Sequence, residues 1–140
     1  MRKIIVPFDG SESARRAVQH AVELAQASPE VKVDLLHVLE WTPAGSRVDA
    51  PAETIEKQNA AEAEEAVRPA KEIAQQAGVV CEVRYRRGSP PTEISNAVRE
   101  GGYDAVIMGT RGLSPMASLM VGSVAMKVLN LVPVPVTLVK

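Results

Sequence analysis

The sequence predicts a single-domain α/β fold, an open and mostly parallel sheet of five strands with helices on both faces. Short apolar segments alternate strictly along the chain with longer segments that have helical periodicity. The first apolar segment has no polar alternation, which is typical of a strand buried on both faces. Right-handed crossovers turn such an alternation into a parallel sheet, and 140 residues suffice for one core. We therefore expect one domain over residues 1–140.

The chain starts with a predicted strand over Ile4–Phe8, a continuous apolar run. Ser11 is suited to cap a helix whose apolar positions recur at helical spacing from Ala14 to Ala25. A second strand is predicted over Val31–Leu39. The segment Thr42–Ala50 contains proline, glycine and serine, and we expect it to be a mobile loop.

A long helix rich in alanine and glutamate is predicted over Ala52–Ala77, with Gly78 at its C-terminal cap. Pro69 lies inside this pattern and should kink or interrupt the helix, because proline has no N–H and clashes with the preceding turn. The third strand is predicted over Val79–Tyr85, which makes Cys81 a buried strand thiol.

The remaining elements follow the same alternation. Ser89 is suited to cap a helix that ends near Gly101. A fourth strand is predicted over Asp104–Met108 and a final strand over Val136–Val139. Between them, a glycine-spaced loop leads into a helix over residues 122–131.

Composition and charge exclude several classes of partner. The formal net charge is −1 at pH 7, which gives no electrostatic case for nucleic acid or an anionic membrane. No segment approaches the roughly 20 apolar residues needed to span a bilayer, and the N-terminal apolar run is too short for a signal peptide. The single cysteine excludes an intrachain disulfide and agrees with a reducing compartment. We therefore expect a soluble, cytoplasmic protein.

Two strand ends carry chemistry that suggests a ligand. Open parallel sheets bind ligands at the carboxyl ends of their strands. Asp9 follows the first strand, whereas Gly109 and Gly112 follow the fourth. A third glycine, Gly122, opens the last helix and is followed by Ser123. We expect these two segments to meet around one site.

The residue types favour a ligand that carries phosphate. Glycine has no Cβ, so backbone can approach a ligand closely. The first N–H groups of a helix have no intrahelical partner and lie at the positive end of its dipole, which makes them a phosphate site. Ser123 adds a hydroxyl donor, and Arg111 adds a permanent cation. Asp9 could accept a hydrogen bond from a ribose hydroxyl, or ligate a phosphate-bound Mg²⁺.

Spacing alone leaves a structural interpretation open. In that interpretation, Gly109 and Gly112 are turn residues and Gly122 allows close packing between helix and sheet. The chain has no G-x-x-x-x-G-K-[ST] P-loop and no G-x-G-x-x-G after the first strand, which excludes those two classes of nucleotide site.

Several segments together resemble the universal stress protein family over the whole chain. They include the first strand with its turn, the glycine-spaced loop and the last strand, at Ile4–Glu12, Leu36–Val38, Gly88–Pro90, Asp104–Ser123 and Val132–Val139. The glycine spacing is similar to that of the ATP-binding branch of this family. The resemblance implies a Rossmann-like, adenine nucleotide alpha hydrolase-like fold with strand order 3-2-1-4-5.

The resemblance also implies a site for ATP, ADP or AMP, with Mg²⁺ as a candidate companion. The backbone of Val38 would contact the adenine. Contacts to ribose and phosphates would come from the first turn and the glycine-spaced loop, at Asp9, Gly109, Arg111, Gly112, Gly122, Ser123 and Val124. Pro7, Phe8 and Met108 would line the pocket, and Ala125 would offer its backbone N–H.

This chain departs from the family pattern at three places. Phe8 is bulkier than the residue common there and would narrow the pocket. Ala125 replaces a residue that is often threonine, which removes one hydroxyl near the phosphates. The stretch Leu113–Val121 contains no cation, so the phosphates would depend on Arg111 and backbone N–H groups. These departures leave the preference among ATP, ADP and AMP open.

Three functions remain as hypotheses. The first is an ATP-binding regulatory protein of the stress response, read by a regulatory protein partner. The second is a slow ATPase or other nucleotide-hydrolysing enzyme, although Asp9 is the only candidate base near the phosphates and we assign no catalytic residue. The third is a protein-interaction module with an empty site. The strand over 136–139 would form an apolar sheet edge, which the family pairs across a two-fold axis, so the resemblance implies a homodimer.

Overall fold

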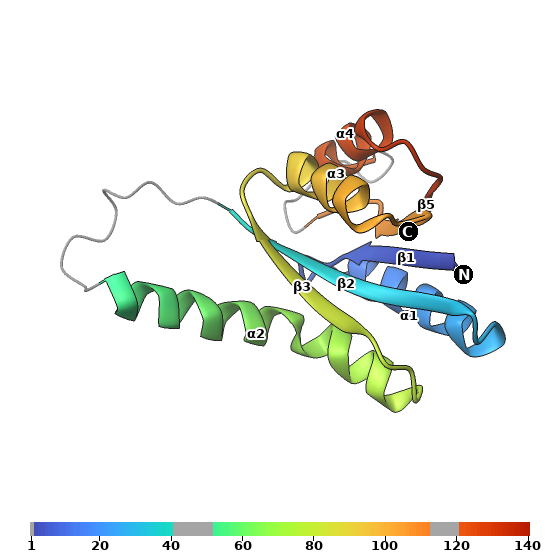
Figure 1. The fold of residues 1–140 in the computed structure, drawn as a ribbon, viewed down its shortest axis with the longest axis horizontal. Coiled ribbons are helices and arrows are strands. Elements are labelled where there is room, and N and C mark those ends of the chain that lie inside the picture. Colours follow the sequence, from blue (N-terminus) through green and yellow to red (C-terminus); the bar gives the residue numbers. More distant parts are fainter. Residues whose placement is uncertain (1, 41–51, 113–120) are drawn as a thin grey trace.

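The computed structural model describes residues 2–40, 52–112 and 121–140. All neighbouring strands are parallel, and the sheet has the order β3-β2-β1-β4-β5 (Figure 1). The elements are β1 (Arg2–Pro7), α1 (Glu12–Ala27), β2 (Val31–Leu39), α2 (Ala52–Gln76), β3 (Glu82–Arg87), α3 (Pro90–Gly101), β4 (Ala105–Gly109), α4 (Ser123–Leu131) and β5 (Val136–Val139). The predicted fold class and strand order are confirmed.

No helix of this described part combines the length and the apolar character that crossing a bilayer requires. The loop predicted over 42–50 lies outside the described residues.

Helices cover both faces of the sheet because successive side chains of a strand point to opposite sides. On one face, Ile4 and Val6 of β1 and Leu35 of β2 pack with α1 and α2. On the other face, Ile5 of β1 and Leu36 of β2 pack with α3 and α4. Because the two apolar clusters fill the space between the sheet and the helices on both faces, a cavity can form only at the ends of the strands.

The third strand begins later than the sequence predicts, since β3 covers Glu82–Arg87 in place of Val79–Tyr85. Val79 belongs instead to the end of α2, where its N–H donates to the carbonyl of Ala74 at 2.9 Å. Gly78 has the left-handed conformation of a helix C-cap, with φ +70°, as predicted. These features form a Schellman cap, in which an apolar residue follows the glycine. The apolar run that indicated a strand is therefore partly a helix cap.

Cys81 precedes β3 and is half-buried, so the prediction of a buried thiol inside the strand is wrong. Its side chain packs at the margin of the cluster under α1 and α2. Burial, and secondarily the negative charge of Asp34, raises the pKa of the Cys81 thiol to about 11. The thiol is therefore protonated and a poor nucleophile at neutral pH.

Helix α2 continues through Pro69, so of the two predicted outcomes the interruption is absent and the kink stays a prediction. Proline has no N–H, so the carbonyl of Glu65 lacks its helical partner. Glu65 lies on the exposed side of the helix, where water can bond to that carbonyl. Val67 and Ala70 are fully buried against the sheet. Their burial stabilises the helix by more than the missing hydrogen bond costs.

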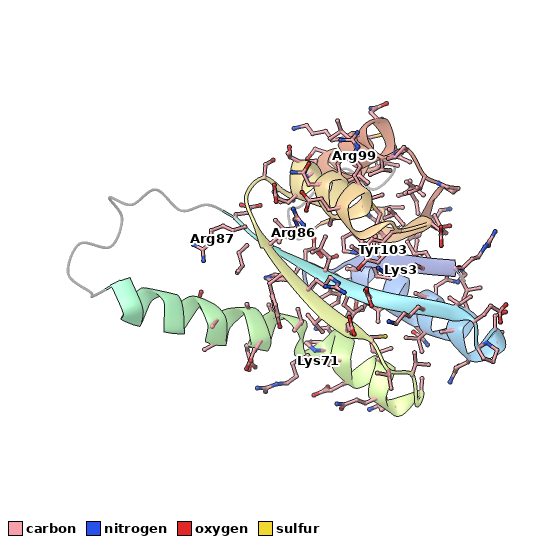
Figure 2. The ribbon with its side chains drawn as sticks, viewed as in Figure 1. Lys3, Lys71, Arg86, Arg87, Arg99 and Tyr103 are labelled. Carbon is pink, nitrogen blue, oxygen red and sulfur yellow. The ribbon has the colours of Figure 1, made fainter. Side chains whose placement is uncertain are left out.

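A buried carboxylate ties β2 to the segment before β4. Asp34 is 1% exposed, and its Oδ2 accepts a hydrogen bond from the hydroxyl of Tyr103 at 2.6 Å. Arg84 Nε lies 3.4 Å from the same oxygen, whereas Oδ1 has no partner among the described residues. Figure 2 shows Tyr103 beside Lys3, whose Nζ lies 4.6 Å from the ring centroid. Burial, followed by the hydrogen bond to Asp34, raises the pKa of Tyr103 to about 12, so its hydroxyl is a donor at neutral pH.

Candidate functional site

A cavity of about 260 Å³ lies at the carboxyl ends of β1, β2 and β4. All the residues predicted for the site contribute to its wall: Pro7, Phe8, Asp9, Val38, Met108, Gly109, Arg111, Gly112, Gly122, Ser123, Val124 and Ala125. The wall also contains residues that were not predicted for it: Ser11, Ala14, Leu36, Glu40, Pro90, Ile94 and Thr110. The structure thus brings the predicted residues together, and their contact with a ligand stays a prediction.

The position of the cavity follows from the strand order. β1 pairs with β2 on one side and with β4 on the other. The chain therefore adds β2 and β3 on one side of β1, and it then adds β4 and β5 on the other side. The loops diverge at such a reversal, and open parallel sheets bind their ligands in the crevice between them. Asp9 follows β1 and Thr110 follows β4, so both loops contribute polar groups to the cavity.

Helix α4 begins at the cavity wall. Its N-cap, Gly122, offers no side-chain hydrogen bond. The carbonyl of Gly122 accepts from the N–H of Met126 at 3.0 Å, which leaves the N–H groups of Ser123, Val124 and Ala125 without a partner among the described residues. Three such N–H groups, at the positive end of the helix dipole, have the chemistry to bind an anion.

Gly122 is held against the loop that follows β4, residues Thr110–Gly112, which we call the post-β4 loop. The N–H of Gly122 donates to the carbonyl of Thr110 at 2.6 Å. A Cβ at Gly122 would lie 3.2 Å from that oxygen and 3.4 Å from Arg111 Cα. The N–H of Thr110 donates in turn to Val139 of β5 at 2.8 Å. A chain of hydrogen bonds thus connects the edge strand, the post-β4 loop and the start of α4.

The carboxylate of Asp9 is held by the turn after β1. The N–H of Ser11 donates to Asp9 Oδ1 at 2.9 Å. Gly112 approaches the other oxygen, since a Cβ at Gly112 would lie 3.1 Å from Asp9 Oδ2. Asp9 is exposed and lines the cavity, so its carboxylate is an oriented acceptor at the rim.

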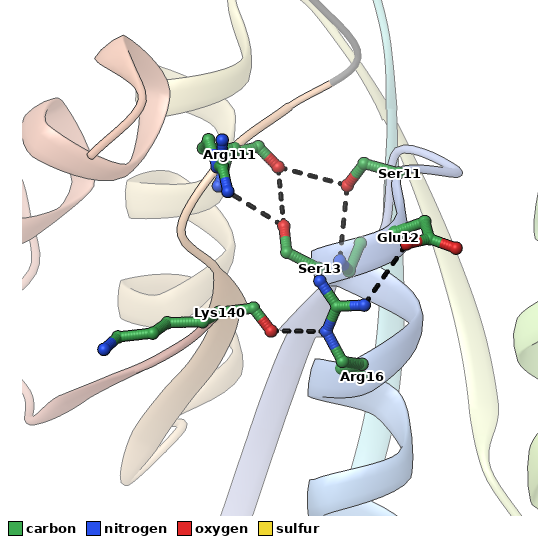
Figure 3. A network of polar contacts seen from close by, with 7 residues as sticks. Ser11, Glu12, Ser13, Arg16, Arg111 and Lys140 are labelled. Atoms are coloured by element: carbon green, nitrogen blue, oxygen red, sulfur yellow. Dashed lines mark hydrogen bonds and ion pairs between the residues drawn. The ribbon is translucent and has the colours of Figure 1, made fainter. Parts of the chain in front are cut away.

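The first turn of α1 is bonded to the post-β4 loop (Figure 3). Ser13 Oγ donates to the carbonyl of Arg111 at 2.7 Å, and Ser11 Oγ donates to the same carbonyl at 3.1 Å. The N–H of Arg111 donates to Ser13 Oγ at 3.3 Å. A Cβ at Gly109 would overlap Ser13 Oγ and lie 2.7 Å from the backbone nitrogen of Ala14. The missing Cβ of Gly109 therefore makes room for α1, whereas the sequence analysis assigned it to close approach of a ligand.

Among the residues that the structure describes, three ionisable side chains line the cavity, those of Arg111, Asp9 and Glu40, and all three residues are exposed. Within the described ranges, no group of three or more His, Cys, Asp or Glu side chains could hold a metal ion.

Sequence reasoning missed the seven further wall residues, and it also missed Ser13, which bonds to the post-β4 loop from outside the wall. Glu40 directly follows β2 and lies two residues after Val38, so continuing the alternation of the strand by one residue was the signal that could have found it. Ser13 bonds to Arg111, which lies 98 residues away, and no local pattern reports such a contact.

Comparison with known proteins establishes the family. The profile of the Universal stress protein family matches residues 1–140. The chain belongs to the universal stress protein family. It is 32% identical over 146 residues to the universal stress protein YxiE of Bacillus subtilis, covering 99% of this chain and 98% of YxiE. It is 29% identical over 140 residues to the universal stress protein MJ0531 of Methanocaldococcus jannaschii, covering 99% of this chain and 82% of the relative.

Solved structures of similar proteins share the fold. The structure of hypothetical protein MJ0577 superposes with a TM-score of 0.81 and 27% identity, covering 99% of this chain and 95% of that chain. A universal stress protein in complex with cAMP superposes with a TM-score of 0.74 and 28% identity, covering 99% and 97%. A universal stress protein of this fold thus holds an adenine nucleotide.

Proposed function

We propose that this universal stress protein binds an adenine nucleotide, with ATP as the expected ligand, and acts as a regulatory protein of the stress response. The observation that carries the proposal is the uncapped start of α4 beside Arg111 on the wall of the cavity. The neighbour in complex with cAMP supports it. ADP and AMP stay within the proposal because residues 113–121 contain no cation. We propose a cytoplasmic location, where the lone Cys81 would stay reduced, and a regulatory protein partner that reads the bound state.

The cavity wall divides by chemistry in a way that fits such a ligand. Apolar side chains of Phe8 and Met108 suit the adenine ring, which the backbone of Val38 would bond. Asp9 would accept from a ribose hydroxyl. The phosphates would bind at the N–H groups of α4 and at Arg111. Mg²⁺, when bound, would neutralise part of the phosphate charge.

The first test is release of ligand from the purified protein. We expect denaturation of the protein to release an adenine nucleotide that mass spectrometry detects. We also expect Mg·ATP, added to nucleotide-free protein, to give a saturable calorimetric signal with a Kd below about 1 mM. Absence of both signals would contradict the proposal. Steady release of phosphate that falls in Asp9→Asn would instead favour the slow ATPase.

We further propose a homodimer through β5. This strand lies at one edge of the sheet and contains no charged residue. The carbonyls of Pro135 and Val139 accept from the β4 side, so the alternate position Val136 directs its N–H outward. The opposite edge strand, β3, carries charged side chains that discourage pairing, at Arg84, Arg86 and Arg87. Figure 2 shows Arg86 and Arg87 along that edge.

Light scattering would test the homodimer. The unmodified chain should have the mass of two chains, whereas Val136→Pro should have the mass of one. Proline is tolerated at the first residue of an edge strand, but it removes the outward N–H that a second copy would need. Val80→Ser is the control, since Val80 is 90% exposed and lies far from β5 in the strand order. A monomeric unmodified chain, or a dimeric Val136→Pro variant, would contradict the proposal.

A further inference from the structure

We propose that Ser13 is a positioning residue that orients the post-β4 loop for the phosphate part of the ligand. The inference rests on the proposed nucleotide binding and names a residue that does not line the cavity. Ser13 lies in the first turn of α1 and is 6% exposed. It would act on the ligand through Arg111.

The side chain of Ser13 uses its hydrogen-bonding capacity on one residue of the loop. Its Oγ donates to the carbonyl of Arg111 at 2.7 Å and accepts from the N–H of Arg111 at 3.3 Å (Figure 3). Both backbone groups of Arg111 are therefore held by one buried hydroxyl. Ser11 adds only one further bond, at 3.1 Å, to the carbonyl.

The two hydrogen bonds between Ser13 and Arg111 lie next to the place where the post-β4 loop contacts α4. Gly122, the N-cap of α4, donates to the carbonyl of Thr110, the residue before Arg111. Helix α1 can approach the post-β4 loop this closely because Gly109 has no Cβ, which would otherwise overlap Ser13 Oγ. Ser13 thus holds the side of the cavity formed by Arg111 and the α4 N–H groups, and it makes no hydrogen bond to Val38 among the described residues.

The placement predicts a selective effect. Loss of the two Ser13 hydrogen bonds should make the backbone of Arg111 more mobile, and with it the side of the cavity that would bind phosphate. The wall around Val38 should keep its shape. Adenosine, which has no phosphate, should therefore bind as before. A role of Ser13 in general stability alone would weaken adenosine and nucleotides alike.

The test is calorimetric titration of the full chain with ATP, AMP and adenosine. We expect Ser13→Ala to weaken ATP and AMP by about 3- to 10-fold, the range for one ordinary hydrogen bond, with less than about 2-fold change for adenosine. Ser13→Cys replaces the hydroxyl by a larger thiol that is a weaker donor and acceptor, so both bonds should weaken without being lost and the loss of affinity should be intermediate. Ser95→Ala is the matched control, because Ser95 is equally buried and its Oγ also donates to a backbone carbonyl, that of Leu131 at 3.4 Å.

Hydrogen exchange provides a second measurement, which does not depend on an affinity. The Arg111 amide should exchange with deuterium faster in Ser13→Ala than in the unmodified chain, because its acceptor is gone. Equal weakening of ATP and adenosine, or unchanged ATP affinity in Ser13→Ala, would overturn the positioning role alone. Failure of the unmodified chain to bind ATP, AMP and adenosine would overturn the proposed function, and this inference with it.

Discussion

Replacement of Gly122 by valine should weaken nucleotide binding by about 100-fold or more, the equivalent of two hydrogen bonds to a charged group. Ser123, Val124 and Ala125, the first three residues of α4, line the cavity directly after this N-cap. Even a single Cβ at Gly122 would lie 3.2 Å from Thr110 O. The two methyl groups of valine must therefore displace the post-β4 loop or occupy the space where the phosphates would bind. Titration calorimetry with ATP measures the loss.

Gly122→Ala provides the graded comparison for this prediction. A single methyl group needs a shift of only a few tenths of an ångström from its neighbours, so its effect should lie well below that of valine. Circular dichroism and thermal unfolding should show that both variants are folded. Unchanged ATP affinity in a folded Gly122→Val variant would mean that the phosphates do not bind at the start of α4.

Asp34→Ala should lower the free energy of unfolding by about 2–4 kcal/mol, the range for leaving buried polar partners unsatisfied. The buried hydroxyl of Tyr103 would lose its carboxylate acceptor. The side chain of Arg84 is half exposed, so water can replace the ion pair that Arg84 would lose, and that ion pair adds little to the cost. Urea unfolding at pH 7 measures the change.

Glu82→Ala is the control for Asp34→Ala, because Glu82 also pairs with Arg84 but is exposed. Its loss should cost less than about 1 kcal/mol, as for other surface ion pairs. Tyr103→Phe should cost about 1–3 kcal/mol, since it removes the 2.6 Å hydrogen bond to Asp34 Oδ2 and leaves that oxygen only the 3.4 Å contact with Arg84 Nε. An Asp34→Ala variant as stable as Glu82→Ala would show that the buried cluster does not hold β2 to the segment before β4.

The alternation of strands and helices could be predicted because each element carries its own periodicity. β1 is apolar throughout, as a strand buried on both faces must be, and the predicted helix cap at Ser11 bonds to the N–H of Ala14. Part of the cavity wall could also be predicted from the residues alone, since the carboxyl ends of parallel strands meet at one edge and the glycine spacing marks the loop there. The other predicted wall residues, Pro7, Phe8, Val38, Met108, Val124 and Ala125, came from the resemblance to universal stress proteins. The resemblance to universal stress proteins supplied the strand order, which the structure confirms.

Tertiary contacts explain what could not be predicted. Val79 and Val80 have strand-like side chains, but the backbone hydrogen bond of Val79 to Ala74 makes the first of them part of a helix cap. Pro69 opposes helix formation locally, yet burial of the neighbouring residues keeps the helix continuous. The absence of a Cβ at Gly109 is visible in the sequence, and only the fold shows that the space is taken by Ser13.

The separation of Ser13 and Arg111 along the chain has a consequence for folding. The bond joins residues 98 positions apart, and β1 meets β4 only after β2, α2, β3 and α3 have been made. Closing so long a loop costs conformational entropy before the contact can repay it, so we expect this pairing to form late in folding. On the ribosome, the cavity cannot form until its second half has emerged. A ligand of this cavity would therefore select the finished fold, and could not serve as a template for an early intermediate.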